Sequence, residues 1–269
     1  GRFVLDGALD PSLDSMGISE GQSRGFQTAL GRFAKDCAGR ANCPWTTRAA
    51  VIRGINALLA RLDVRAMPTR SRTSLVQAEA VTAIFYSMYT TLLWPSLRVA
   101  LRQAKANNGT GLQTLAAFAN DKTGPNSYGS NMTSAFFAIS CWDNPAPPEA
   151  DGLRAAGRAW ARTAIVPELA RAMSWSNAPC STWFGHSPVA PAPANTTTAS
   201  PILVIGTTYD PATPYWWAVA LHNQLPTSTL LTYRGDGHTA YGSGSDCVDN
   251  AISTYLLTGT MPAAGTVCR

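Results

Sequence analysis

Two apolar runs near the C-terminus constrain the fold of this chain more than any other feature of its sequence. The first, Ile202–Ile205, is aliphatic throughout, and a run without polar alternation is typical of a strand buried on both faces in a parallel sheet. The second, Ser228–Tyr233, follows after a segment long enough for a helix. A strand, a helix and a second strand in this order predict an α/β fold with a parallel sheet.

The segment between the two runs has the pattern of a helix. Thr213 is a residue type that caps helices, and Pro214 suits a first helical position. Apolar side chains then recur at helical spacing, at Trp217, Leu221 and Leu225. The apolar face of residues 247–256 predicts a further helix after the second strand, and Gly259 is expected to end it.

Each predicted strand is followed by a titratable side chain, Asp210 after the first and His238 after the second. Ligands gather at the carboxyl edge of parallel sheets, and an acid followed by a histidine is the order of a Ser-Asp-His hydrolase triad. In such a triad the imidazole takes the serine proton, and the carboxylate fixes the imidazole tautomer. Asp210 is therefore a candidate orienting acid and His238 a candidate base. The alternative is an Asx-turn at Asp210 before Pro211, with His238 as a polar loop residue.

The nucleophile of such a triad is missing. The chain contains one literal Gly-x-Ser-x-Gly, Gly21–Gly25, but a nucleophile elbow needs an apolar strand just before its serine, and the preceding residues have turn chemistry instead. Ser19 with Gln22 three residues later indicates a capping box at the start of a helix. Ser23 is therefore expected in a first helical turn and not as a nucleophile.

Several motifs occur together in a recognisable order. They are Arg2–Pro11, Phe26–Phe33 running into Cys37, Ala138–Asp143, and the Asp210 and His238 segments with Cys247 and Cys268. This ordered set covers nearly the whole chain and resembles the secreted tripeptidyl aminopeptidases of actinobacteria and their relatives in the α/β-hydrolase fold.

The resemblance implies an α/β-hydrolase sheet with Asp210 as the acid and His238 as the base. In that family the segment similar to Phe3–Asp6 is the strand just after the nucleophile elbow and its helix. The nucleophilic serine is therefore expected upstream of Gly1. The chain then resembles the C-terminal portion of a longer enzyme, and its expected partner is the N-terminal half of the hydrolase core, which includes the elbow.

The middle of the chain is too long for a simple connection between strands and too helical for a disordered segment. Apolar side chains recur at helical spacing in four stretches: Val76, Ala80, Ile84 and Met88; Leu97, Leu101 and Ala104; residues 112–120; and residues 149–175. We expect a hydrolase core strand at 1–10, a large helical cap insertion at 11–200, and the C-terminal hydrolase core, with the acid and base, at 201–269. The Pro/Ala/Thr-rich stretch 188–200 is interpreted as the connector that returns the cap to the sheet.

The six cysteines allow 15 pairings. The family resemblance implies the sequential pairing, which closes three local loops: Cys37–Cys43, Cys141–Cys180 and Cys247–Cys268. Three disulfides imply an oxidising compartment, so the protein is expected to be secreted or in the cell envelope. Buried free thiols in a cytosolic protein are the alternative. No metal site is expected, because no Cys-x-x-Cys occurs and none of the three histidines has ligand spacing to a cysteine.

The charge pattern excludes little. The 21 Lys and Arg residues exceed the 16 Asp and Glu residues by five, but they are scattered, and no basic stripe with aromatic residues predicts nucleic-acid binding. No apolar run is long enough to cross a bilayer. No cofactor is expected.

An aminopeptidase needs a carboxylate to pair with the α-ammonium group of its substrate, because burying that charge without a partner is costly. Glu79, an acid in a helix otherwise rich in apolar and hydroxyl residues, and Asp143, beside Trp142 and a predicted disulfide, are the candidates. The alternatives are a solvated helix position for Glu79 and a helix or turn cap for Asp143.

Together these features predict a secreted serine exopeptidase that cleaves short peptides from free N-termini through an acyl-enzyme. A carboxylesterase of the same fold and a non-catalytic binding module are the alternatives. Since acid and base without a nucleophile retain little of the mechanism, the chain alone is expected to be inactive.

Overall fold

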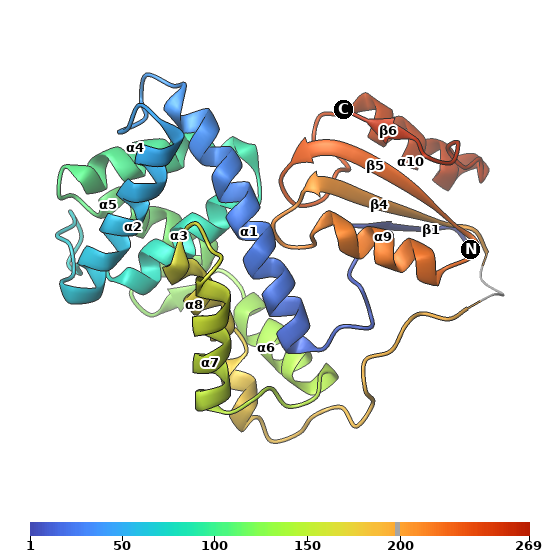
Figure 1. Ribbon diagram of the computed structural model, residues 1–269, viewed down its shortest axis with the longest axis horizontal. Coiled ribbons are helices and arrows are strands. Elements are labelled where there is room, and N and C mark those ends of the chain that lie inside the picture. The colour runs from blue at the N-terminus through green and yellow to red at the C-terminus, as the bar shows by residue number, and fades with distance from the viewer. Residues whose placement is uncertain (197–199) are drawn as a thin grey trace. The chain divides into compact units, whose positions relative to one another are not determined.

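The computed structural model describes residues 1–196 and 200–269, and these form two compact units. The sheet unit comprises residues 1–29 and 189–269, and the helical unit comprises residues 30–188 (Figure 1). Within the predicted connector 188–200, residues 197–199 lie outside the described residues.

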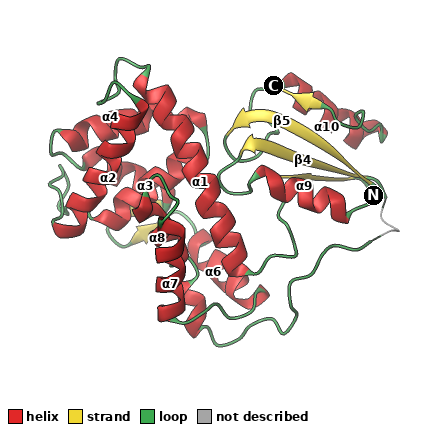
Figure 2. Cartoon of the chain, in the orientation of Figure 1, coloured by secondary structure: helices red, strands yellow, loops and turns green. Residues whose placement is uncertain are grey.

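The sheet unit is built on four parallel strands in the order β1-β4-β5-β6. They are β1 (Phe3–Asp6), β4 (Ile202–Tyr209), β5 (Ser228–Asp236) and β6 (Val267–Cys268). Figure 2 shows these strands in yellow with helices beside them. The predicted strands at 3–6, 202–205 and 228–233 are therefore confirmed, and β4 and β5 extend beyond the predicted ranges at their carboxyl ends.

Both faces of this sheet are covered by helices of the same unit. On one face Leu203, Ile205 and Leu231 pack in a buried cluster with side chains of α10 (Asp246–Thr258). On the other face Val204 packs against α9 (Tyr215–Gln224). Because successive side chains of a strand point to opposite faces, an all-aliphatic run is what a sheet covered on both sides requires. Gly259 ends α10 in the left-handed conformation, at φ 83°, as its position predicts.

Helix α1 (Ser15–Ala38) begins four residues before the predicted capping box, so that prediction is wrong. The cap is Asp14, whose Oδ1 accepts the Gly17 N–H at 2.7 Å. Ser19 lies one turn inside the helix and is only 2% exposed, and Gln22 donates its side-chain N–H to the Ala212 carbonyl at 2.9 Å. Tertiary packing has placed both side chains on the buried face of a helix that was already capped.

The helical unit contains a series of short helices and one small hairpin. Its elements after α1 are α2 (Arg48–Val64), α3 (Gln77–Met88), η1 (Thr91–Leu93), α4 (Trp94–Lys105), α5 (Thr110–Ala119), β2 (Lys122–Gly124), β3 (Ser127–Tyr128), α6 (Met132–Asp143), α7 (Ala150–Ala161), α8 (Pro167–Ser174) and η2 (Ala178–Thr182). The predicted helical stretch 149–175 is two helices. The first ends at Ala161, and the second begins at Pro167, because the residue before a proline, here Val166, disfavours helical geometry.

Two of the predicted apolar faces of this unit, those on α3 and α4, are buried except at Val76. Ala80, Ile84 and Met88 on α3 are at most 1% exposed, and Leu97, Leu101 and Ala104 on α4 are fully buried. Val76 is the N-cap of α3 and is 46% exposed, since it precedes the first turn and does not share the inward face.

The structure has three disulfides, and they join the pairs that the family resemblance implies. Cys37–Cys43 and Cys141–Cys180 lie in the helical unit, and Cys247–Cys268 ties α10 to β6 in the sheet unit. The described residues include no free cysteine.

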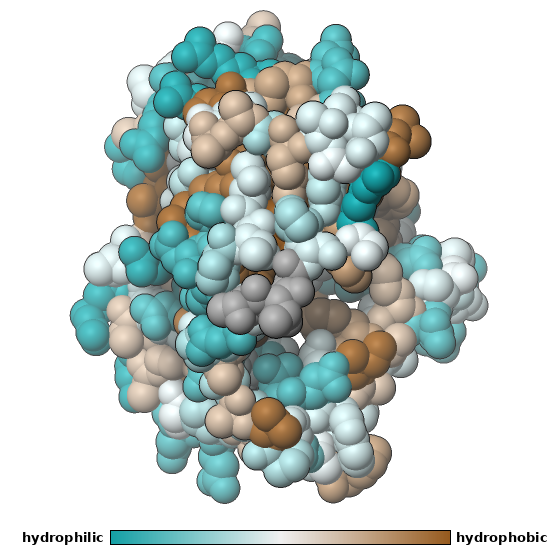
Figure 3. All heavy atoms as spheres, turned by 90° about the vertical axis from the view of Figure 1, so that its right-hand side faces the viewer, coloured by the Kyte–Doolittle hydropathy of each residue, from teal (hydrophilic) through white to brown (hydrophobic). Residues whose placement is uncertain are grey.

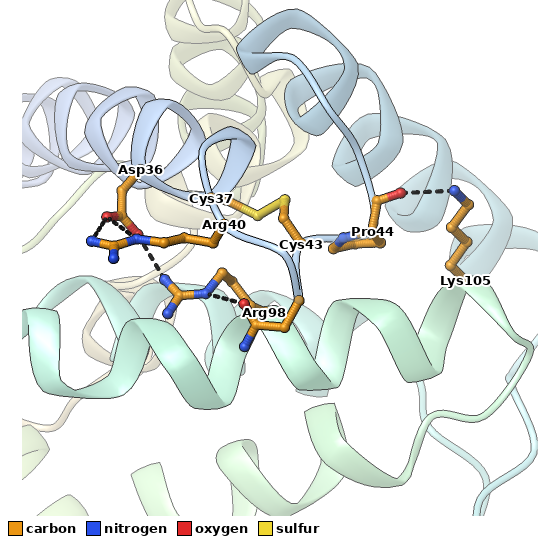
Figure 4. The surroundings of a disulfide bond; sticks show 8 residues. Asp36, Cys37, Arg40, Cys43, Pro44, Arg98 and Lys105 are labelled. Atoms are coloured by element: carbon orange, nitrogen blue, oxygen red, sulfur yellow. Dashed lines mark hydrogen bonds and ion pairs between the residues drawn. A yellow bond between two sulfur atoms is a disulfide. The ribbon is translucent and has the colours of Figure 1, made fainter.

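A charged cluster surrounds the first of these disulfides (Figure 4). The Arg98 guanidinium, 9% exposed, donates to Asp36 Oδ2 at 2.7 Å and to Asn42 Oδ1 at 3.0 Å. Arg40 pairs with the other Asp36 oxygen at 2.9 Å. Arg98 is thus a nearly buried cation with a carboxylate partner, and the loop closed by Cys37–Cys43 supplies its second acceptor.

The surface mixes polar and apolar side chains. On the face drawn in Figure 3 hydrophilic and hydrophobic residues are interspersed. Large apolar side chains such as Phe3 and Leu257 are exposed in the sheet unit. None of the helices in the described ranges has the length and apolar character needed to span a membrane.

Candidate active site

Asp210 and His238 meet at the carboxyl edge of the sheet. The parallel pairing places Tyr209, the last residue of β4, opposite Asp236, the last residue of β5, so the residues that follow the two strands are neighbours. His238 Nδ1 lies 3.0 Å from Asp210 Oδ2 and 3.1 Å from Oδ1. The Asp210 side chain has no exposed area, whereas the His238 side chain is 30% exposed.

The Asp210 carboxylate is buried among hydrogen-bond donors. Its Oδ1 accepts the N–H groups of Ala212 and Thr213, each at 2.8 Å, and its Oδ2 accepts the Thr213 hydroxyl at 2.9 Å and the Thr239 N–H at 3.2 Å. The Ala212 bond is an Asx-turn, so Asp210 makes this turn and also holds His238. These donors satisfy the buried carboxylate and fix its orientation.

Thr213 does not cap the following helix, contrary to the prediction. The N-cap position of α9 is Pro214, which makes the helix begin one residue later than expected. The Thr213 hydroxyl turns toward the site, where its oxygen lies 2.9 Å from Asp210 Oδ2 and 3.2 Å from His238 Nδ1. Burial of the acid, with its need for donors, has overridden the local capping preference.

The pKa of His238 reflects opposing influences. Burial, the largest single one, lowers this pKa, but the hydrogen bond and charge of Asp210 and the charge of Asp6 outweigh it, so the pKa of His238 lies above the ordinary histidine value. With its Nδ1–H donated to Asp210, the imidazole must accept a proton at Nε2. This is the tautomer that a general base in a triad requires.

Asp6, at the end of β1, is a site residue that the sequence analysis did not single out. Its carboxylate accepts the N–H groups of Ala240 at 2.9 Å and Tyr241 at 2.8 Å, just after His238. The available signal was its position: it follows the apolar residues Phe3–Leu5 at the end of β1, as Asp210 follows β4. The chain therefore brings carboxylates from two neighbouring strands to the loop that carries the histidine.

The Gly21–Gly25 motif is a helix-packing motif. Ser23 lies in the interior of α1, 3% exposed, and not at a strand-to-helix turn, which agrees with its rejection as a nucleophile elbow. A Cβ at Gly21 would come within 2.3 Å of the Trp217 ring, and one at Gly25 within 2.6 Å of the Pro211 carbonyl. The two glycines, four residues apart on one helix face, let α1 approach the loop that follows Asp210.

The two candidate substrate-binding acids lie apart from Asp210 in sequence, both in the helical unit. Glu79 is in the first turn of α3, where its Oε2 accepts the Val76 N–H at 3.1 Å, and it lines a cavity of about 890 Å³ with Gln113, Asn120 and other residues of that unit. Asp143 is the exposed last residue of α6. No group of three or more His, Cys, Asp or Glu side chains in residues 1–196 and 200–269 has the arrangement of a metal site.

Comparison with known proteins finds similarity to hydrolases. Residues 166–268, which include Asp210 and His238, match the family described as TAP-like protein. Strands β4, β5 and β6 of the parallel sheet lie within the matched residues.

Curated relatives cover the chain from end to end. It is 34% identical to a carboxylesterase B of Mycobacterium tuberculosis and 32% identical to the serine protease Hip1 of the same species, each over 99% of this chain and 51% and 52% of the relative. It is 32% identical to a tripeptidyl aminopeptidase of Streptomyces lividans over 54% of this chain and 27% of that protein. The chain is homologous to these hydrolases and spans about half the length of the two mycobacterial relatives.

Proposed function

We propose that this chain supplies the acid and base of a secreted serine exopeptidase that releases short peptides from free N-termini. The observation that carries the proposal is the contact between the buried Asp210 carboxylate and His238 Nδ1, 3.0 Å apart at the carboxyl edge of a parallel sheet. Homology to a serine protease and a tripeptidyl aminopeptidase supports it.

In the proposed reaction the serine hydroxyl attacks the substrate carbonyl carbon while His238 Nε2 takes the hydroxyl proton. The protonated imidazole, steadied by Asp210, then gives this proton to the leaving amine as the carbon–nitrogen bond breaks, which leaves an acyl-enzyme. Water attacks the ester in the second half, again with His238 as base, and the serine is released with its proton restored.

The serine is proposed to belong to a polypeptide segment that precedes Gly1 and to reach the site beside β1. Within the described sheet β1 pairs only with β4, so its other edge presents backbone groups that a further strand can bond. A cavity of about 410 Å³, lined by residues 4–9, Pro11 and Leu221, runs along this strand. The half-length coverage of the two mycobacterial relatives is consistent with such a segment.

For the substrate, we propose that residues 11–200 act as a cap and that Glu79 or Asp143 pairs with the free α-ammonium group. Glu79 is the stronger candidate because it lines a cavity, whereas Asp143 is exposed at a helix end. The three disulfides support an oxidising, extracytoplasmic location.

The test uses the complete polypeptide, this chain with the segment before it. A peptide p-nitroanilide with a free N-terminus should be hydrolysed, and His238→Ala should reduce kcat about 10⁴-fold or more, whereas Asp246→Ala, at an exposed position of α10, should leave it unchanged. Hydrolysis that survives in His238→Ala would refute the assignment of the base.

A second candidate, a carboxylesterase with the same acid and base, is favoured by the carboxylesterase relative at 34% identity. The two reactions differ in what they need from Glu79. An exopeptidase should lose affinity when the substrate is N-acetylated or when Glu79 is changed to Gln, so that KM rises. If the protein is an esterase, the wild type and Glu79→Gln should hydrolyse short p-nitrophenyl esters equally well. Neither should hydrolyse the peptide with a free N-terminus. A protein that hydrolyses neither substrate would be a binding module.

A further inference from the structure

Four consecutive backbone N–H groups after His238 each donate to a carboxylate. Thr239 N–H binds Asp210 Oδ2 at 3.2 Å, those of Ala240 and Tyr241 bind Asp6 at 2.9 and 2.8 Å, and Gly242 N–H binds Asp249 Oδ1 at 2.8 Å. The three acids belong to different elements, the loop after β4, strand β1 and helix α10. We define residues 237–242 as the histidine loop.

The histidine loop holds one residue, Thr239, in a backbone conformation that its side chain does not favour. Thr239 has φ 66°, in the left-handed region that a β-branched residue rarely enters, and Gly237 has φ 108°. Such a conformation persists only where surrounding contacts hold it in place. In this loop the charge-assisted hydrogen bonds to three fixed carboxylates oppose the strain.

Two of these carboxylates bind the backbone of the loop beyond the histidine itself. Asp6 and Asp249 bind backbone N–H groups two to four residues beyond His238, so these bonds can position its ring through the loop. Asp6 is also fixed from its own side, because β1 pairs with β4 through Asp6 and Ile205. The loop is thereby anchored to the same sheet edge that carries the acid.

The geometry points to Asp6 and Asp249 as positioning residues, which hold the histidine loop in the conformation that presents His238 to Asp210. The consequence for catalysis rests on the proposed function, whereas the anchoring itself does not. Asp6 has a second effect through its charge.

That second effect is electrostatic. The acids that face the histidine loop are Asp210, Asp6 and Asp249, and Asp236 ends β5 two residues before His238. After burial, which lowers the pKa of His238, the charges of Asp210 and Asp6 are the influences that raise it. Replacing Asp6 with Asn keeps an oxygen that can accept the two N–H groups but removes the charge, so it separates the two roles of Asp6.

The test is an NMR titration of this chain, which needs no nucleophile. The Cε1–H resonance of His238 is followed against pH in the wild type, Asp6→Asn and Asp246→Asn. Asp246, in the first turn of α10, is exposed and is the matched control. Asp6→Asn should lower the pKa of His238, and Asp246→Asn should leave it where it is.

Amide hydrogen exchange measures the anchoring. Asp6→Ala should speed exchange at Ala240 and Tyr241 about tenfold or more, and Asp249→Ala should do the same at Gly242, while Asp246→Ala changes neither. If Asp6→Ala unfolds the protein, Asp6→Asn still reports the effect of the charge on the pKa of His238. Asp249→Ala still reports the effect of an anchoring carboxylate on amide exchange. An unchanged pKa in Asp6→Asn would overturn the electrostatic role, and unchanged exchange in the alanine variants would overturn the anchoring.

In the complete polypeptide Asp6→Asn should also move the acidic limb of the kcat/KM profile to lower pH, in step with the pKa of His238. If the pKa of His238 shifts in Asp6→Asn but the complete polypeptide hydrolyses no substrate, the proposed function is wrong. The roles of Asp6 and Asp249 in the histidine loop would still stand.

Discussion

Gly7 lies directly against the imidazole of His238. A Cβ built at Gly7 would come within 3.1 Å of His238 Cε1, and within the same distance of the Thr213 hydroxyl and the Thr239 methyl group. Gly7 also has φ 73°, a left-handed conformation that side chains other than glycine adopt at a cost. The chain turns at this point from β1 past the candidate base. Only a glycine combines a left-handed backbone with the lack of a Cβ that this close approach requires.

Gly7→Ala should therefore destabilise the protein and disturb the site. The left-handed backbone alone costs about 1–2 kcal/mol, and crowding against His238 adds about 1 kcal/mol or more. Gly244→Ala is the control, because Gly244 also has a positive φ, 92°, but a Cβ there meets nothing within 4 Å. Urea unfolding gives both free energies. Equal losses in the two variants would show that Gly7 is required for its backbone conformation alone.

The raised pKa of His238 predicts opposite pH dependences for stability and activity. A folded-state pKa above the unfolded value means that protonation of His238 favours the folded state. This contribution is fully present below the ordinary pKa of about 6.5 and is lost as the pH rises through the folded-state pKa. Hydrolysis needs the neutral imidazole, so it should increase over the same window.

Comparing urea unfolding of the wild type and His238→Asn at about pH 6 and about pH 8.5 isolates this contribution. The stability advantage of the wild type over His238→Asn should be larger at the lower pH. An advantage that grows with pH would contradict the direction of the pKa shift.

The strands and the Asp210–His238 pair were predictable because the signals are local. An aliphatic run such as Ile202–Ile205 specifies a strand covered on both faces, and parallel pairing then brings the residues after β4 and β5 together without further information. The position of the pair follows from the fold class alone.

The roles of Asp6, Thr213 and Ser19 could not be predicted because they depend on partners far away in sequence. Asp6 meets Ala240, which lies 234 residues later, and no local pattern indicates which carboxylate will meet which N–H group. At Thr213 and Ser19 the local capping preference was present but weaker than tertiary packing, which placed the first beside a buried acid and the second inside α1. Local sequence signals thus predict the helices and strands, whereas contacts between distant residues decide the roles of single side chains.

The packing role of the Gly21–Gly25 motif predicts that Gly21→Ala is destabilising, although alanine is the better helix former by about 1 kcal/mol. The added Cβ would lie 2.3 Å from the ring of Trp217, which is 2% exposed and has no room to move. A net loss of about 1–3 kcal/mol is expected in urea unfolding. Gly17→Ala in the same helix is the control. The atoms nearest to a Cβ there belong to the Leu13 and Asp14 side chains, at 3.2 Å and beyond, and that variant should be neutral or more stable. If both variants are equally stable, the motif has no packing role.

The Cys141–Cys180 disulfide should be the main attachment of α6 to the helical unit. Cys141 is the one residue among those of α6 that is buried, so little apolar contact holds this helix without the bond. The bond closes a separation of 39 residues, compared with 6 for Cys37–Cys43, so chain entropy predicts losses of about 4 and about 2 kcal/mol when each pair is replaced by serines. Urea unfolding tests the order of these losses.

Limited proteolysis tests the local effect, because only the Cys141→Ser/Cys180→Ser protein should become cleavable within residues 132–149 under native conditions. Equal protection of that segment in both double variants would mean that contacts other than the disulfide hold α6.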